Sequence, residues 1–311
     1  MTKEKDVTEK TLEAYSDVFA DIVNGLLFHG EQVISEDHLI DAQPFSMIKA
    51  DGKIHEQDRD VAKFWVDPEG KTVNVRIAFL GIENQTSYDE DMPLRVISYD
   101  GAAYRAQLDV KERYPVVTLV LYFGYNKWGK NRSLYDVIDI PEKLKPYVND
   151  YRIHVYEIAH LKEEDIRCFR SDFQVVVDYF VHKRTDPSYR PKDPVKFKHV
   201  DELLKLMSAL TRDPRFVETL QAEGGKPENM DKLLDMIEAR GEERGIAIGE
   251  ERGIAIGEER GIAIGIQKGM IVTLADLVKD NTLSLQAAAE KANMTVAEFE
   301  HEVRLLADPI K

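Results

Sequence analysis

The order of apolar and polar residues changes from helical to strand spacing within the first third of the chain. Residues 8–28 place apolar side chains at helical intervals, and His29-Gly30 supplies a glycine to end that helix. Two short strands, 58–66 and 72–82, then lie on either side of a turn signal at Asp67-Pro68-Glu69-Gly70. This pattern predicts a helix followed by a β-hairpin.

Further segments complete a mixed α/β pattern. Residues 114–123 are almost continuously apolar, which is typical of a strand buried on both faces in the middle of a sheet. A helix predicted at 91–108 separates this strand from the hairpin, and such a helix implies a crossover connection. The other predicted elements are a strand at 151–158, helices at 170–184 and 198–220, and irregular segments at 31–57 and 126–150.

The second hairpin strand ends in a cluster of polar side chains, Glu83-Asn84-Gln85. Because side chains alternate along a strand, Glu83 and Gln85 project to the same side, next to the open space left by Gly81. A carboxylate and an amide at the end of a core strand suit a metal ion or a bond to be cut. The simpler alternative is a strand that becomes polar where it meets solvent.

The pairing of the hairpin decides whether a second acid reaches Glu83. With a tight turn, Asp60 would lie six residues, roughly 20 Å, from Glu83 along the strand. Pairing of residues 60–66 with 77–83 would bring the two carboxylates together and leave 67–76 as a wide loop. We predict this looser pairing. Under the tight pairing, Asp58 or Glu56 becomes the better partner for Glu83.

The predicted helix 91–108 adds a cation near the same strand end. Arg95 and Tyr99 are four residues apart and therefore share one face of the helix. Arg95 either forms a surface salt bridge or contacts a phosphate group, which guanidinium groups bind well. We predict Arg95 and Tyr99 as substrate-binding residues.

A glycine-rich repeat follows the α/β segment. The octamer Gly-Glu-Glu-Arg-Gly-Ile-Ala-Ile begins at 241, 249 and 257, and every fourth residue from Gly241 to Gly269 is glycine. Each glycine costs a helix about 1 kcal/mol relative to alanine. We predict a weak helix over 241–269 that either packs against a second copy, giving a homo-oligomer, or acts as a spacer. The Glu-Glu-Arg triplets oppose membrane insertion.

Composition narrows the class of protein. The chain has 311 residues, of which 43% are hydrophobic and 32% charged, with a net charge of −15. This charge argues against a general nucleic-acid coat, but it does not exclude a nuclease whose carboxylates hold divalent metals. The lone Cys168 excludes an intramolecular disulfide, and the N-terminus lacks the apolar centre of a signal peptide. We therefore expect a cytoplasmic protein with no membrane partner.

Three runs of residues carry a family resemblance. Asp-Arg-Asp-Val at 58–61, Leu-Gly-Ile-Glu-Asn-Gln-Thr at 80–86 and Met-Pro-Leu-Arg-Val-Ile-Ser-Tyr at 92–99 resemble the Rpn family of recombination-promoting nucleases. That family, often labelled putative transposases, belongs to the PD-(D/E)XK nuclease superfamily. The resemblance covers roughly residues 10–220. It implies an α/β, PD-(D/E)XK (restriction-endonuclease-like) core with a mixed sheet flanked by helices, plus an α-helical C-terminal extension.

The resemblance also implies roles for individual residues. Asp60 matches the first acid of the motif, Glu83 the second, and Gln85 the position that lysine occupies in most of the superfamily; no proline precedes Asp60. The implied function is a metal-dependent DNA endonuclease linked to recombination or a mobile element. Asp60 and Glu83 would hold Mg²⁺, or Mn²⁺ or Ca²⁺ in its place. The alternative is a catalytically inactive DNA-binding or assembly protein that keeps the nuclease fold.

The expected organisation has three parts. A nuclease-like domain spans 1–220, and the repeat helix or spacer spans 221–269. A small helical tail at 270–311 has two short helices, whose expected N-caps are Ser284 and Thr295.

Overall fold

The computed structural model describes residues 11–42, 45–50, 53–58, 60–67, 76–109, 111–191, 195–221 and 225–307. Contacts divide the chain into two compact units, Met1–Ile237 and Glu238–Lys311. The long helix α8 (Met230–Lys279) begins in the first unit and continues into the second.

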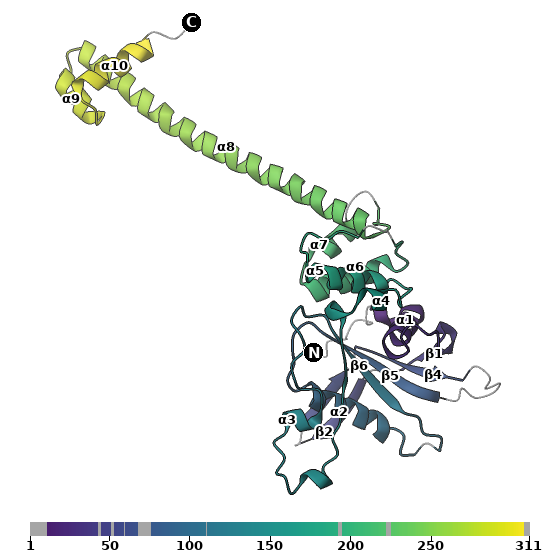
Figure 1. The fold of residues 1–311 in the computed structure, drawn as a ribbon. Helices are drawn as coiled ribbons and strands as arrows, with labels where there is room; N and C mark the ends of the chain where they lie inside the picture. Colours follow the sequence, from purple (N-terminus) through teal and green to yellow (C-terminus); the bar gives the residue numbers. More distant parts are fainter. Residues whose placement is uncertain are drawn as a thin grey trace. The chain divides into compact units, whose positions relative to one another are not determined.

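A five-stranded mixed sheet forms the centre of the first unit (Figure 1). Its order is β1-β4-β5-β6-β7, in which β1, β4 and β5 pair antiparallel and β5, β6 and β7 pair parallel. A separate antiparallel pair is formed by β2 and β3. The strands are β1 (Leu39–Asp41), β2 (Phe45–Ala50), β3 (Lys53–Asp58), β4 (Val61–Val66), β5 (Arg76–Gln85), β6 (Val116–Tyr122) and β7 (His154–Glu157). The predicted mixed α/β fold is confirmed.

The hairpin of β4 and β5 has the looser pairing. Val61 pairs with Ile82 and Val66 pairs with Arg76, with a register shift between Trp65 and Val66. This pairing confirms the prediction from the sequence, because position 60 comes next to position 83 rather than position 77. Most of the predicted wide loop, residues 68–75, lies outside the described residues.

Helices cover both faces of the sheet (Figure 1). Apolar residues of α1 (Ser16–Leu27), α5 (Phe173–Lys183) and α6 (Val200–Thr211) pack with the face that carries Leu80 and Ile82 of β5. The opposite face is covered by α2 (Met92–Arg105), whose Met92 and Val96 pack against Val120 of β6. Because α2 connects the parallel strands β5 and β6, the predicted crossover is confirmed.

Short elements complete the first unit. They are the 3₁₀ turns η1 (Leu12–Ala14), η2 (Glu36–His38), η3 (Lys145–Tyr147), η4 (Ile158–His160) and η5 (Thr219–Gln221), and the helices α3 (Leu134–Val137), α4 (Glu163–Ile166) and α7 (Arg215–Glu218).

Two expectations from the sequence need correction. The helix predicted over 8–28 is confirmed over Ser16–Leu27, and residues 8–10 lie outside the described residues. It is interrupted at Tyr15, which is extended (φ −72°, ψ 132°) and stacks its ring on His199 at 3.8 Å between centroids. The segment 31–57, expected to be irregular, contains β1, β2 and β3. The sequence Asp-Gly at 51–52 is typical of hairpin turns, but the residues on either side lack the strict apolar alternation that would have indicated strands.

The second unit contains the repeat region, which is helical as predicted. Residues 241–269 are exposed throughout, and a Cβ atom added at any of their eight glycines would have no neighbour within 4 Å. One 18-residue window of α8, with mean hydropathy 1.5, is long and apolar enough to cross a membrane. Length and composition are the only features that select it.

Two short helices fold back on the end of α8. Ile271 and Leu274 of α8 pack with alanines of α9 (Leu285–Lys291) and with Phe299 of α10 (Val296–Ala307). Ser284 accepts a hydrogen bond from the Ala287 amide, and Thr295 exchanges hydrogen bonds with Glu298. Both predicted N-caps are therefore confirmed.

Candidate active site at the end of strand β5

The polar end of β5 has the side-chain arrangement expected from strand alternation. Glu83 is buried, with 3% of its surface exposed, and Gln85 Nε2 donates to Glu83 Oε1 at 3.3 Å. Both side chains therefore lie on the α2 side of the sheet. Asn84, between them, points to the opposite side, where α1 lies.

Asp60 lies directly before β4, one residue beyond the last pair of the hairpin, Val61–Ile82. Opposed residues of antiparallel strands have Cα atoms about 5 Å apart, so this register brings Asp60 near Glu83. The Asn84 backbone amide donates to Asp60 Oδ2 at 2.6 Å. Desolvation by neighbouring groups raises the pKa of the Asp60 carboxyl, while the Asn84 amide and the charge of Arg95 act in the opposite direction.

Arg95 on α2 brings positive charge to the same cluster. Its guanidinium forms an ion pair with Glu83, donates to Asp89 Oδ2 at 2.8 Å, and donates to the Tyr99 hydroxyl at 3.2 Å. Burial opposes the charged form, but the bonds to Asp89 and Tyr99 and the charge of Glu83 raise the pKa of Arg95 above its usual range. Of the two roles considered for Arg95, the structure has the salt bridge. A contact between Arg95 and a phosphate stays a prediction.

One acidic residue of the cluster was missed from the sequence. Glu13, in η1, is buried with 1% of its surface exposed, and its Oε1 accepts a hydrogen bond from Asn84 Nδ2 at 3.1 Å. Burial, together with the charge of Asp60, raises the pKa of Glu13 to about 7. Within the described part of the chain, Glu13 Oε2 and Asn84 Oδ1 are buried without a hydrogen-bond partner. Nothing in the local sequence marks Glu13, because its partner is 71 residues away.

The acidic side chains at this strand end suit only a metal ion that needs few protein ligands. The described residues contain no group of three or more His, Cys, Asp or Glu side chains that could hold a metal ion. Mg²⁺, however, often binds one or two protein carboxylates and keeps several waters. Asp60 and Glu83 fit that requirement in chemistry, whereas Glu13 is bonded to Asn84 on the opposite side of the sheet. Arg95 already neutralises one oxygen of Glu83.

Two cavities open beside this strand end. One, of about 430 Å³, is lined by Gln85 and residues 87–91. The other, of about 360 Å³, shares Ser87 and Tyr88 with the first and extends to the loop after β6. The space next to Gln85 is therefore large enough for part of a substrate.

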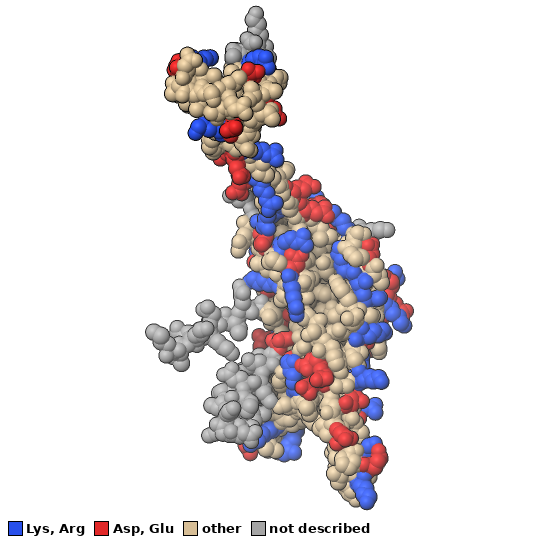
Figure 2. Space-filling view, turned by 90° about the vertical axis from the view of Figure 1, so that its left-hand side faces the viewer, with Lys and Arg blue, Asp and Glu red and all other residues tan. Residues whose placement is uncertain are grey.

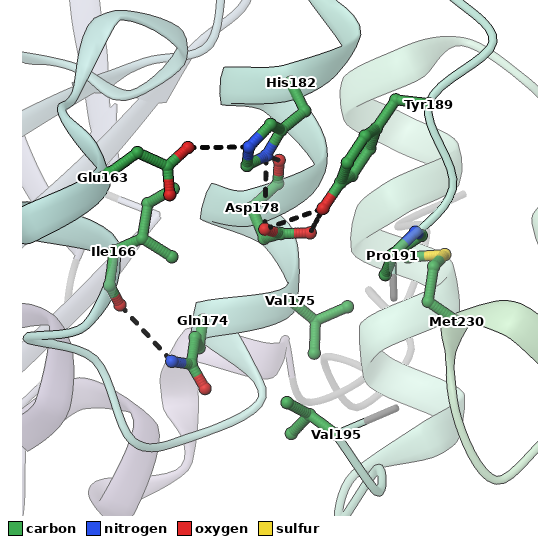
Figure 3. Close-up of a pocket in the computed structure, with 10 residues that line it drawn as sticks. All are labelled: Glu163, Ile166, Gln174, Val175, Asp178, His182, Tyr189, Pro191, Val195 and Met230. Carbon is green, nitrogen blue, oxygen red and sulfur yellow. Dashed lines mark hydrogen bonds and ion pairs between the residues drawn. The ribbon is translucent and has the colours of Figure 1, made fainter. Parts of the chain in front are cut away.

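A third cavity, of about 360 Å³, lies away from this edge and is bounded by α4, α5 and the start of α8 (Figure 3). His182 Nε2 lies 2.7 Å from Glu163 Oε1, its Nδ1 lies 3.2 Å from Asp178 Oδ1, and its ring stacks on Tyr189. Because both ring nitrogens are engaged and the ring is covered, His182 is poorly placed to act as a general base. We interpret this cluster as a structural connection between α4, α5 and the segment that carries Tyr189.

Positive and negative side chains are mixed on the surface. On the face shown in Figure 2, the described lysine and arginine side chains are interspersed with aspartate and glutamate side chains. The net charge of −15 is therefore not gathered into one acidic surface there.

The fold and the site define an α/β protein with a mixed sheet. Its carboxylates Asp60 and Glu83 lie at the end of β5, the strand that pairs antiparallel with β4 and parallel with β6. Residues 64–188 match the model of a protein family described as "Putative transposase, YhgA-like". Over that segment, this match confirms the family resemblance seen in the sequence. It contains Glu83, Gln85, Arg95 and Tyr99, and begins just after Asp60. Neither a curated relative nor a solved structure gave a significant match.

Proposed function

We propose that the protein is a metal-dependent DNA endonuclease that hydrolyses phosphodiester bonds, linked to recombination or a mobile element. The observation that carries the proposal is the loose pairing of β4 and β5, which brings Asp60 beside Glu83. A strand end that only became polar at the surface would not need a buried carboxylate, and Glu83 is 3% exposed.

Asp60 and Glu83 would hold Mg²⁺, with Mn²⁺ or Ca²⁺ as substitutes. The bound ion would supply Lewis acidity at the phosphodiester and lower the pKa of a water. Gln85 hydrogen-bonds to Glu83 and lies at a cavity wall, so its amide could orient a water molecule or hold a phosphate oxygen. Arg95 and Tyr99 would contact the phosphate backbone, which requires Arg95 to exchange an acidic partner for a phosphate oxygen.

The second candidate function is a catalytically inactive DNA-binding or assembly protein. The ion pair between Arg95 and Glu83 favours it, because a guanidinium occupies one of the oxygens that a metal would use. Glutamine at position 85 also favours it, since an amide cannot supply the positive charge of the superfamily's lysine.

Cleavage of supercoiled plasmid separates the two functions. Purified protein should nick plasmid in Mg²⁺ or Mn²⁺ but not in EDTA, and Asp60→Asn and Glu83→Gln should abolish nicking. Glu142→Gln is the matched control, because Glu142 is an exposed surface acid. Protein that binds plasmid in a gel-shift assay but never nicks it supports the inactive alternative. Nicking by Asp60→Asn and Glu83→Gln at the wild-type rate would show that other residues perform the chemistry.

A further inference from the structure

The cavity between β5 and the loop after β6 has aromatic side chains on its walls. Tyr88 and Tyr125 both line it and expose 41% and 48% of their surfaces. Its volume of about 360 Å³ falls in the range of about 300–1,000 Å³ that is typical of small-molecule sites. The cavity lies at the carboxyl end of the parallel strands β5 and β6, the edge where open α/β sheets bind ligands.

The position of Tyr88 is fixed by packing rather than left to solvent. Its ring meets Trp128 edge to face at 5.1 Å between centroids, and Trp128 meets Tyr122 in the same manner at 5.0 Å. Gly129 allows this arrangement, because a Cβ atom there would lie 2.6 Å from the Tyr88 ring. An aromatic surface that is held in place yet exposed can bind a flat ligand with little loss of side-chain freedom.

Polar groups complete the cavity. Ser87 and Asn126 offer hydrogen-bonding groups, and Lys127 offers a positive charge. The combination of aromatic rings, an amide and a cation is typical of sites that stack a base and contact its phosphate. Ser87 and Tyr88 also line the adjoining cavity beside Gln85, so the two spaces are neighbours along one chain segment.

We propose that this cavity binds an unpaired nucleobase adjacent to the bond that is cut, an inference that rests on the proposed action on DNA. The faces of bases in a duplex are covered by stacking, so the tyrosine rings reach only a base that is unpaired or turned out of the helix. DNA with a gap or bulge is therefore the favoured substrate class, and Tyr88 and Tyr125 provide the stacking surfaces.

Binding measured without cleavage tests the site. Fluorescence anisotropy in EDTA would compare a labelled duplex with the same duplex carrying a short unpaired gap. The wild type should bind gapped DNA more tightly, and Tyr125→Ala should lose about 5- to 150-fold in affinity for gapped DNA only, the cost of one lost base stack. Gly129→Ala should act similarly by displacing the Tyr88 ring. Tyr125→Phe, which keeps a stacking ring, and Tyr147→Ala, at a residue 84% exposed, should retain the preference.

The outcomes separate this inference from the proposed nuclease function. Equal affinity for gapped and paired DNA, or a preference that survives both Tyr125→Ala and Gly129→Ala, would overturn the base-binding site even if plasmid is nicked normally. A tyrosine-dependent preference for gapped DNA in a protein that nicks nothing would support the site while refuting the nuclease. Melting temperatures of the variants check that each one is folded.

Discussion

Replacing glycines of the repeat with alanine tests how the repeat helix is used. Apart from the backbone of its own helix turn, no atom lies within 4 Å of a Cβ added at Gly245, Gly249, Gly253 or Gly257, so alanine meets no steric conflict. Each substitution should stabilise the helix by about 1 kcal/mol, and all four together by about 4 kcal/mol. Because about 1.4 kcal/mol is a tenfold change in an equilibrium, local opening should become about 1,000-fold rarer. Hydrogen–deuterium exchange followed by mass spectrometry would report this as slower amide exchange across 241–269.

The same variants test self-association, which we propose as one use of the repeat. If glycines let two helices approach closely, the added methyl groups would separate them and lower the solution mass measured by light scattering. Ala255→Gly is the matched control and should speed local exchange, since it adds a glycine to an exposed position. Faster exchange and a lower mass in the alanine variant would refute the reasoning from the single helix and favour a helix pair.

Three further changes test the site and its support. Burial raises the pKa of Glu13 from 4.5 to about 7, so the stability that this group contributes is present below pH 4.5 and is lost as pH rises to 7. The free energy of unfolding of Glu13→Gln, measured in urea, should therefore rise by about 3 kcal/mol relative to that of the wild type between pH 4.5 and pH 8. A difference between the two proteins that stays the same across this pH range would contradict the reasoning. Lys63 is buried and forms an ion pair with Asp41. Asp41→Ala leaves the buried ammonium unpaired and should lower the free energy of unfolding by about 3 kcal/mol, whereas Lys63→Met removes the buried charge and should be nearly neutral in the same assay. Equal losses of stability in the two variants would contradict this. Gln85→Lys should increase Mg²⁺-dependent plasmid nicking, because it places a positive charge beside Glu83. A nicking rate below that of the wild type would refute this.

The hairpin shows how much could be predicted from sequence. Its turn signal at 67–70 favoured a tight pairing, and only the need to bring Asp60 to Glu83 favoured the looser pairing that the structure has. Strand alternation was sufficient to place Glu83 and Gln85 on the same side, because that property is local.

The parts that could not be predicted depend on long-range contacts. The Asn84 side chain reaches Glu13 across 71 residues, and the amide of Asn84 holds Asp60. Neither bond leaves a signal in the residues next to it. Tyr15 is a similar case, because its helix is interrupted where its ring meets His199. The choice between two partners for Arg95 was visible from the sequence, whereas its simultaneous contact with Glu83 and Asp89 was not.

The fold-back of α9 and α10 has a consequence for shortened forms of the protein. Ile271 and Leu274 belong to the most apolar part of α8, where Lys268 and Asp276 are the only charged residues between Arg260 and Lys279. The two short helices cover Ile271 and Leu274, whereas Ile262, Ile264 and Ile266 stay exposed. A chain cut after α8 would expose Ile271 and Leu274 as well and so lengthen the apolar surface of the helix, which favours aggregation.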